Sequence, residues 1–167
     1  MVKKRRLSRT AGHFYKAVLL FSDAYQELPR SARDLLHCLV YELRYIKNKN
    51  IKRTTYPNNG KVSYTEIQFK KEFGHASNTY LFARDRLIKN GLIKQTYRGG
   101  MCRGDMATYK VLIASDLRES ELRWLRYPKQ NWEKEIPKNK NTLVGVKTRI
   151  KSKPTLINST LNGEIHP

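Results

Sequence analysis

Acidic residues are scarce in this chain of 167 residues, in which 14 Asp and Glu stand against 34 Lys and Arg. The formal net charge is therefore +20 at pH 7. An excess of this size indicates a polyanionic partner, and nucleic acid is the polyanion that we expect. The alternatives are a protein of the ribosomal type and a protein whose charge serves only its solubility.

Long hydrophobic runs and cysteines are equally scarce. The main apolar run, residues 17–21, is too short to span a bilayer, and the basic N-terminus lacks the apolar core of a signal peptide. Cys38 and Cys102 match neither a disulfide framework nor a zinc motif. Cys38 falls in an apolar helical pattern and is expected to be buried. We expect a protein of the bacterial cytosol or nucleoid, without a membrane partner.

Catalytic motifs are also lacking. The four histidines are scattered, without the spacing of a metal site. No glycine-rich loop of the Walker type is present, and the few carboxylates are dispersed, whereas a nuclease needs them clustered. We therefore predict that the protein is not an enzyme, and we expect neither a cofactor nor a bound metal.

The positive charge is concentrated at the two ends of the chain. Residues 1–12 hold five basic residues and no acidic one, and residues 137–167 hold six basic residues and one acidic one. This distribution predicts a basic flexible arm over 1–12, a folded domain over 13–135 and a basic, disordered tail over 136–167. The arm is either solvated or in contact with phosphates through Lys3, Lys4, Arg5 and Arg6.

Two helical patterns precede the centre of the chain. Over 13–27, apolar residues recur at steps of three and four, although a strand is an alternative for the first half; these residues are Phe14, Val18, Phe21 and Tyr25. Ser31 is then expected to cap a helix that runs to Ile46 or Lys47. Its apolar stripe is Leu35, Leu36, Leu39, Val40, Leu43 and Ile46. The basic stretch 47–60 is expected to be a surface loop that ends in a turn at Pro57–Gly60.

Residues 61–113 carry most of the functional information. A helix over 64–73 is expected to end at Gly74, where a left-handed residue suits a glycine. A second helix, capped by Ser77, runs to Lys89 and stops at Asn90-Gly91. Strands over 92–97 and 107–113 follow, and the glycine-containing loop 98–106 joins them. The order predicts a mainly α, α+β fold: a helix-turn-helix closed by a wing of two or three strands.

A helix-turn-helix lays the N-terminal half of its second helix in the major groove of DNA. With Tyr80, Ala83 and Leu87 turned inward, the outward candidates for DNA binding are Asn78, Thr79, Phe82, Arg86 and Lys89. Asn78 suits adenine, Thr79 suits a base or a phosphate, and Phe82 suits a thymine methyl group. Arg86 and Lys89 lie further along the helix and are expected at phosphates. Asp85 is expected to pair with a neighbouring Lys or Arg. The alternative is that Ser77 and Asn78 only begin the helix.

The wing and the preceding helix add basic candidates. Arg98 and Arg103 flank glycines in the wing loop, where an arginine can enter a minor groove or hold a phosphate. Lys70 and Lys71 on the first helix are further candidates for phosphate contacts. An ordinary flexible hairpin and a solvated helix face are the alternatives.

The sequence from Asn58-Asn59-Gly60 through Gly91-Leu92-Ile93 to Arg98-Gly99-Gly100, closed by Ala107–Leu112, resembles a known family. It is similar to winged helix-turn-helix DNA-binding proteins of phages, plasmids and other bacterial mobile elements. The resemblance covers roughly residues 14–127. It implies a winged-helix fold and DNA binding in a transcriptional regulator or a replication initiator.

Together these patterns predict a sequence-specific protein that binds double-stranded DNA, either a transcriptional regulator or a replication-initiation factor of a mobile element. The alternative is a non-enzymatic module for RNA, ribonucleoprotein or protein interaction built on a winged helix. Residues 117–135 are expected to form one helix broken at Pro128. Its Trp124 and Trp132 either supply a homodimer interface or pack on their own domain, and we favour the second.

Overall fold

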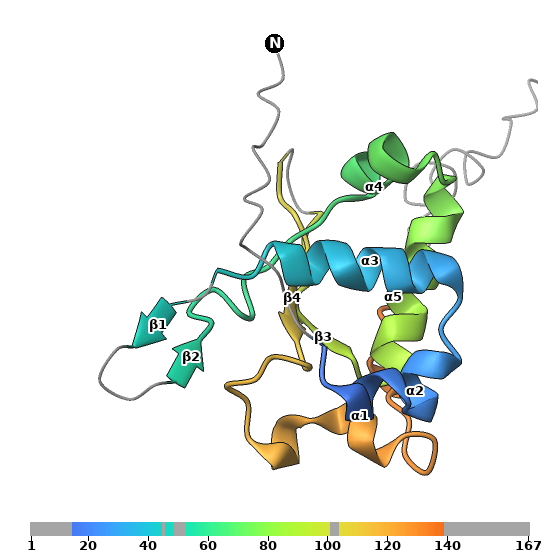
Figure 1. Cartoon of the computed structure of the whole chain (residues 1–167). Helices are drawn as coiled ribbons and strands as arrows, with labels where there is room; N and C mark the ends of the chain where they lie inside the picture. Colours follow the sequence, from blue (N-terminus) through green and yellow to red (C-terminus); the bar gives the residue numbers. More distant parts are fainter. Residues whose placement is uncertain (1–14, 45, 49–52, 101–103, 139–167) are drawn as a thin grey trace, which may run out of the picture. The chain divides into compact units, whose positions relative to one another are not determined.

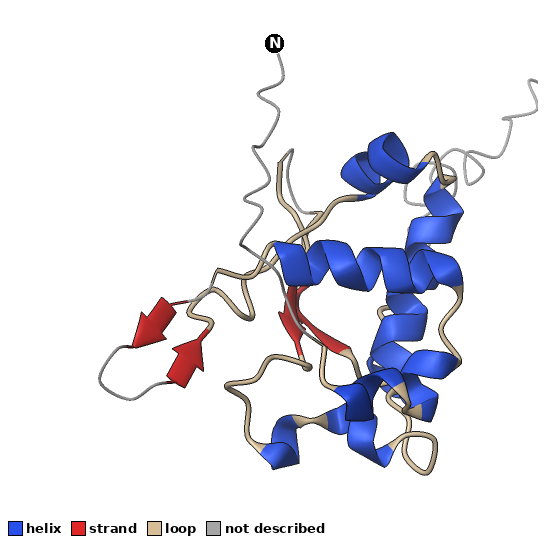
Figure 2. Cartoon of the chain, in the orientation of Figure 1, coloured by secondary structure: helices blue, strands red, loops and turns tan. Residues whose placement is uncertain are grey.

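A computed structural model describes residues 15–44, 46–48, 53–100 and 104–138. The chain divides into two units, Met1–Pro137 and Lys138–Pro167, and every helix and strand named here belongs to the first. The α-helices are α1 (Ala17–Leu20), α2 (Asp23–Gln26), α3 (Arg30–Tyr41), α4 (Glu66–Phe73) and α5 (Ser77–Lys89). The strands are β1 (Ile46–Asn48), β2 (Arg53–Thr55), β3 (Ile93–Tyr97) and β4 (Thr108–Val111). The prediction of an α+β chain is confirmed (Figures 1 and 2).

The core forms where α3 packs against α5. Both helices turn apolar side chains inward at helical spacing. The buried residues are Ala32, Leu35, Leu36, Leu39 and Val40 of α3 and Tyr80, Ala83, Leu87 and Ile88 of α5. Full burial of one such leucine contributes about 1.5–3 kcal/mol, so this contact fixes α5 firmly to the domain. Cys38 is only partly buried against this core, and burial raises the pKa of its thiol to about 11.

A short turn joins α4 to α5, and the two helices pack against each other. A capping box begins α4: the Thr65 hydroxyl accepts from the Gln68 amide, and the Gln68 side chain accepts from the Thr65 amide. Gly74 ends the helix in the left-handed conformation, at φ 70°. Phe69, with none of its surface exposed, anchors α4 in the core. Gly74 therefore ends the helix as predicted, whereas the helix begins at Glu66 and not at Tyr64, because Thr65 caps it.

An antiparallel hairpin of β3 and β4 follows α5, with Ile93 opposite Val111. The segment before α4 joins it through a bridge between Val62 and Tyr109, where the Tyr109 amide donates to the Val62 carbonyl oxygen at 2.7 Å. The hairpin therefore adjoins both ends of the α4–α5 pair.

The structure contradicts the expected helix face over 13–27. The segment forms two short helices, and Val18 and Phe21 are 65% and 82% exposed. Leu19, Ala24 and Leu28 are buried instead. The reason is a break at Ser22, whose hydroxyl donates to the Leu19 carbonyl oxygen at 2.6 Å and whose extended backbone resets the helical phase.

The limits predicted for the next helix are also wrong. Pro29, and not Ser31, precedes the first helical residue, and α3 ends at Tyr41. Asn58 explains the early end, because its side chain accepts from the Arg44 amide at 2.8 Å and donates to the Glu42 carbonyl oxygen at 2.9 Å. Those contacts replace a further helical turn. Ile46, expected in the buried stripe, instead begins β1 and is 59% exposed.

The stretch 47–60 is not wholly a loop, since β1 and β2 form an antiparallel pair within it. The turn at 57–60 is present as expected, and Asn59 binds both the amide and the carbonyl group of Val111. This pairing of Asn59 with β4 fixes the turn to the β3–β4 hairpin.

The broken helix predicted over 117–135 is not formed. The described chain there makes three 3-10 turns, η1 (Glu119–Glu121), η2 (Arg123–Arg126) and η3 (Glu133–Glu135). Leu122, at φ −78° and ψ 76°, leaves the helical region between the first two. Trp124 and Trp132 are 4% and 8% exposed, so both tryptophans pack on their own domain.

Candidate nucleic-acid interface

Three of the predicted DNA-binding residues lie on one exposed face of α5. Asn78, Phe82 and Arg86 follow one another at steps of four, which places them on the same side of the helix. All three are exposed, and the opposite side of α5 holds the buried residues Tyr80 and Leu87. We call Asn78, Phe82 and Arg86 the α5 face. Thr79, beside it, is partly buried.

The start of α5 differs from the prediction in one respect. Ala76 precedes the first helical residue, and no side chain caps the helix, so Ser77 is not a cap. Ser77 lies in the first turn and is exposed, as is Asn78. The first turn contains no acidic residue, and its amide groups favour a negative charge.

The C-terminal half of α5 is more strongly engaged within the protein. The Lys89 ammonium lies 3.2 Å from a Glu133 carboxylate oxygen, so the predicted phosphate contact of Lys89 competes with this ion pair. The Arg86 guanidinium lies 5.1 Å from the centre of the Phe82 ring. Arg86 and Lys89, which the sequence predicted alike as phosphate contacts, thus differ in the structure, because only Lys89 is engaged in an ion pair with a described residue.

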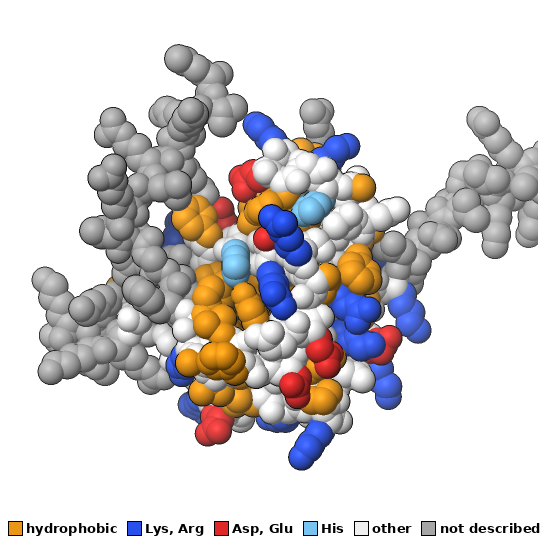
Figure 3. Space-filling model, turned by 45° about the vertical axis from the view of Figure 1, so that its right-hand side comes forward, with side chains coloured by type: hydrophobic (Ala, Val, Ile, Leu, Met, Phe, Trp, Pro, Cys, Tyr) orange, Lys and Arg blue, Asp and Glu red, His pale blue; other side chains and the backbone are white. Residues whose placement is uncertain are grey.

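Basic side chains extend beyond α5. Lys70 and Lys71 lie in the last turn of α4, are exposed, and form no ion pair with any residue that the structure describes. Figure 3 shows lysine and arginine side chains along the middle and right of one face, with fewer acidic ones among them. The α4 lysines are therefore available to an anionic partner.

Contacts between the two arms hold the β3–β4 hairpin together beyond its strands. The Tyr97 hydroxyl donates to Asp105 at 2.9 Å, and the Gly100 amide donates to the Asp105 carbonyl oxygen at 3.1 Å. Gly99 has φ +67°, and a Cβ there would lie 2.5 Å from the Ala107 nitrogen. Only glycine permits this close approach. Arg98, which follows the last residue of β3, is exposed.

The remaining predicted site residues are not among those described. Arg103, predicted in the wing, and Lys3, Lys4, Arg5 and Arg6, predicted in the N-terminal arm, lie outside the described ranges. Their predicted roles stay predictions.

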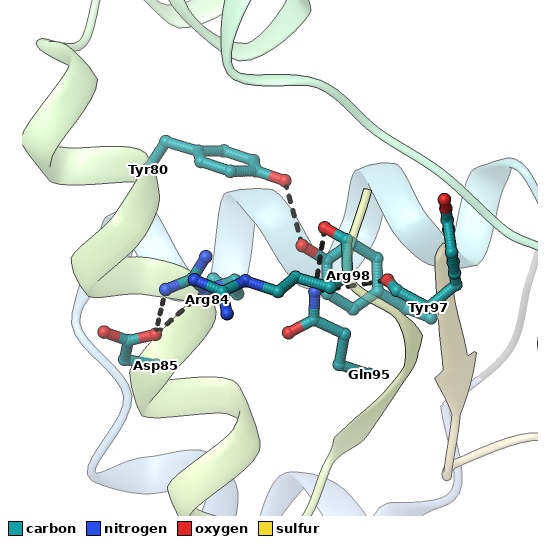
Figure 4. Close-up of polar contacts among 7 residues, drawn as sticks. Tyr80, Arg84, Asp85, Gln95, Tyr97 and Arg98 are labelled. Atoms are coloured by element: carbon teal, nitrogen blue, oxygen red, sulfur yellow. Dashed lines mark hydrogen bonds and ion pairs between the residues drawn. The ribbon is translucent and has the colours of Figure 1, made fainter. Parts of the chain in front are cut away.

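A buried polar network fixes the inner side of α5, and the sequence reasoning missed it (Figure 4). Arg84 is 9% exposed and pairs with Asp85 at 2.7 Å, which confirms the expected pairing of Asp85. The Tyr80 hydroxyl donates to the Tyr64 carbonyl oxygen at 2.7 Å and lies 3.3 Å from the Tyr109 hydroxyl. The burial of Arg84 could have been predicted from its spacing: it lies four residues after Tyr80 and three before Leu87, which places it on the inward side of the helix with them.

Burial sets the protonation state of this network. It raises the pKa of Tyr80 and the pKa of Tyr109 above the ordinary value of 10.0, because a phenolate loses its hydration there. Both phenols therefore remain neutral donors near neutral pH. Neutral phenols can hold α5 to β4 without placing a negative charge behind the α5 face.

Comparison with known proteins adds no assignment. No protein-family model matches the chain, and no curated protein or solved structure is significantly similar to it. Among the described residues, no helix is both long enough and apolar enough to cross a membrane.

Proposed function

We propose that this chain is a winged-helix protein that binds double-stranded DNA sequence-specifically through the α5 face. The observation that carries the proposal is the exposure of Asn78, Phe82 and Arg86 on one side of a helix whose other side is anchored in the core. The succession of α3, the Val62 bridge, α4, α5 and the β3–β4 hairpin supports it. A winged helix has the same order of elements.

In this proposal α5 enters the major groove with its N-terminal half, where Asn78 and Thr79 meet base edges. The β3–β4 hairpin acts as the wing and brings Arg98 to the neighbouring groove. Lys70 and Lys71 bind phosphates, which adds affinity and salt dependence but no sequence preference. The protein carries out no chemistry of its own. It serves as a transcriptional regulator or a replication-initiation factor of a bacterial mobile element.

RNA is the second candidate partner. The Phe82 and Tyr97 rings are 48% and 47% exposed. Phe82 shares the α5 face with Arg86, and Tyr97 directly precedes Arg98 in the chain. Exposed aromatic rings among arginines suit the stacking of unpaired bases. Duplex DNA remains the first choice because a helix with its opposite side buried fits the major groove.

Selection from random pools tests the proposal. The full chain is incubated with a random duplex DNA pool and, in parallel, with a random RNA pool at one salt concentration. We expect a DNA consensus to be enriched and no RNA consensus. Equal binding of every duplex, with no enriched motif, would contradict sequence-specific binding, and a preferred RNA motif would favour the second candidate.

Matched variants assign the binding to a surface. The triple variant Asn78→Ala/Phe82→Ala/Arg86→Ala should lose the selected site. The double variant Lys129→Ala/Gln130→Ala removes the same single positive charge from exposed residues elsewhere and should keep it. Circular dichroism of both variants verifies that their folds are retained.

A further inference from the structure

Of the three cationic side chains of α5, only Arg86 is left without a carboxylate among the residues that the structure describes. Arg84 pairs with Asp85 at 2.7 Å, and Lys89 pairs with Glu133 at 3.2 Å. The Arg86 side chain forms no hydrogen bond or ion pair with any described residue, and its guanidinium instead lies 5.1 Å from the centre of the Phe82 ring. Its N–H donors therefore remain open to a ligand.

The stack positions those donors. A guanidinium over an aromatic ring is held by the electrostatic attraction of the ring face. The planar group keeps its N–H edge free while it is stacked, and it loses less freedom on binding because it is already ordered. Arg86 is thus held against Phe82 and directed along the α5 face.

The surroundings of Arg86 are unfavourable for a phosphate. A hydrogen bond to Glu27 raises the pKa of Tyr127 to about 12, and the positive charge of Arg86 opposes that rise, so Arg86 lies within electrostatic range of this pair. The Glu27 carboxylate repels a phosphate more strongly than it repels the neutral acceptors of a base edge.

We propose that Phe82 and Arg86 form a preformed binding site for a thymine and a guanine in neighbouring base pairs of the major groove. The Phe82 ring contacts the thymine methyl group, and Arg86 donates two hydrogen bonds to O6 and N7 of the guanine. The guanidinium lies 5.1 Å from the ring centre, which is between one and two of the steps of about 3.4 Å that separate base pairs along the DNA axis, so the two groups reach bases close together in the groove. This inference rests on the proposed function and changes the expected role of Arg86 from phosphate contact to base recognition.

Single-atom changes in the DNA test the site. Within a selected site, uracil replaces each thymine in turn, and 7-deazaguanine, which lacks N7, replaces each guanine. At one thymine, we expect loss of the methyl group to weaken binding by the full chain about fourfold. At one guanine, loss of N7 removes one of the two hydrogen bonds of a pair worth about 1–3 kcal/mol, so we expect binding to weaken roughly 2- to 12-fold.

Protein variants then assign each penalty. In Phe82→Ala the penalty for uracil should vanish, and in Arg86→Ala the penalty for 7-deazaguanine should vanish. Lys71→Ala, which removes an exposed lysine of α4, should retain both penalties at their wild-type size.

Two results would overturn the inference in distinguishable ways. If a DNA motif is selected but the 7-deazaguanine penalty is the same in Arg86→Ala as in the wild type, the base contact is wrong and the proposed function stands. If no DNA motif is selected at all, the proposed function fails and the inference fails with it.

Discussion

The hydroxyl oxygens of Tyr80 and Tyr109 lie 3.3 Å apart in the buried interior and join α5 to β4. The same Tyr80 hydroxyl donates to the Tyr64 carbonyl oxygen, which belongs to the segment before α4. One side chain of α5 therefore contacts both the hairpin and the segment that leads into α4. The position of the α5 face relative to the hairpin depends on these contacts.

Removal of the Tyr80 hydroxyl should destabilise the protein. Tyr80→Phe leaves the Tyr64 carbonyl oxygen without its side-chain donor, and we expect the free energy of unfolding to fall by about 1–3 kcal/mol. Urea denaturation at pH 7 measures the change. Tyr41→Phe is the control, because Tyr41 is 54% exposed, and its effect should stay within about 0.5 kcal/mol. Equal effects of the two variants would contradict the structural role of Tyr80.

The buried phenols also predict alkaline unfolding. Burial raises the pKa of Tyr80 and that of Tyr109 in the folded state, whereas both return to about 10 in the unfolded chain. The unfolded state then loses protons first, so the stability they contribute is complete below pH 10 and is lost as the pH rises above it. Each tyrosine should add a slope of about −1.4 kcal/mol per pH unit. Urea titrations at pH 9, 10 and 11 should show a shallower decline for Tyr80→Phe, and an unchanged decline would be inconsistent with this account.

Two glycines in left-handed conformations should respond differently to alanine. At Gly91, with φ +73°, a Cβ would lie 2.7 Å from Trp132 and 2.9 Å from Arg123. At Gly74, with φ +70°, it would meet nothing within 4 Å. Gly74→Ala should cost only the left-handed backbone, about 1–2 kcal/mol. Gly91→Ala should cost about 1–3 kcal/mol more, because Trp132 must move. Equal losses in thermal unfolding would show that Trp132 does not close over Gly91.

The parts of the fold that depend on local sequence were predictable. Apolar spacing located α4 and α5, and Gly74 and Asn90-Gly91 gave their ends. These signals need only a few neighbouring residues, since helical phase and left-handed turns are local properties.

The parts that depend on distant contacts were not. Asn58 ends α3 through bonds to residues 14 and 16 positions earlier, and no pattern near residue 42 reveals them. The helix breaks at Ser22, and this break allows Leu19 before it and Ala24 after it to be buried in the core. The same holds for the candidate site: spacing identified the α5 face, but the engagement of Lys89 by Glu133 joins residues 44 positions apart.

The lysines of α4 should affect affinity and not sequence choice. Lys70→Gln/Lys71→Gln should weaken binding to selected and random duplexes alike. It should also reduce the slope of log affinity against log salt by about 0.9 for each phosphate that the variant no longer neutralises. Lys129→Gln/Lys134→Gln, a control with the same charge change on other exposed residues, should leave both quantities nearly unchanged. A loss of sequence preference in the α4 variant would argue against a phosphate contact.

The most direct test of DNA recognition by the α5 face is the ratio of dissociation constants for a selected duplex and a random duplex of equal length. It is measured for the wild type and for Asn78→Ala at one salt concentration. Because an asparagine that binds adenine is worth about 1–3 kcal/mol of discrimination, Asn78→Ala should raise the dissociation constant for the selected duplex, and with it this ratio, roughly 5- to 150-fold while the random duplex is bound as before. If Asn78→Ala matches the wild type on both duplexes, the α5 face does not read the bases.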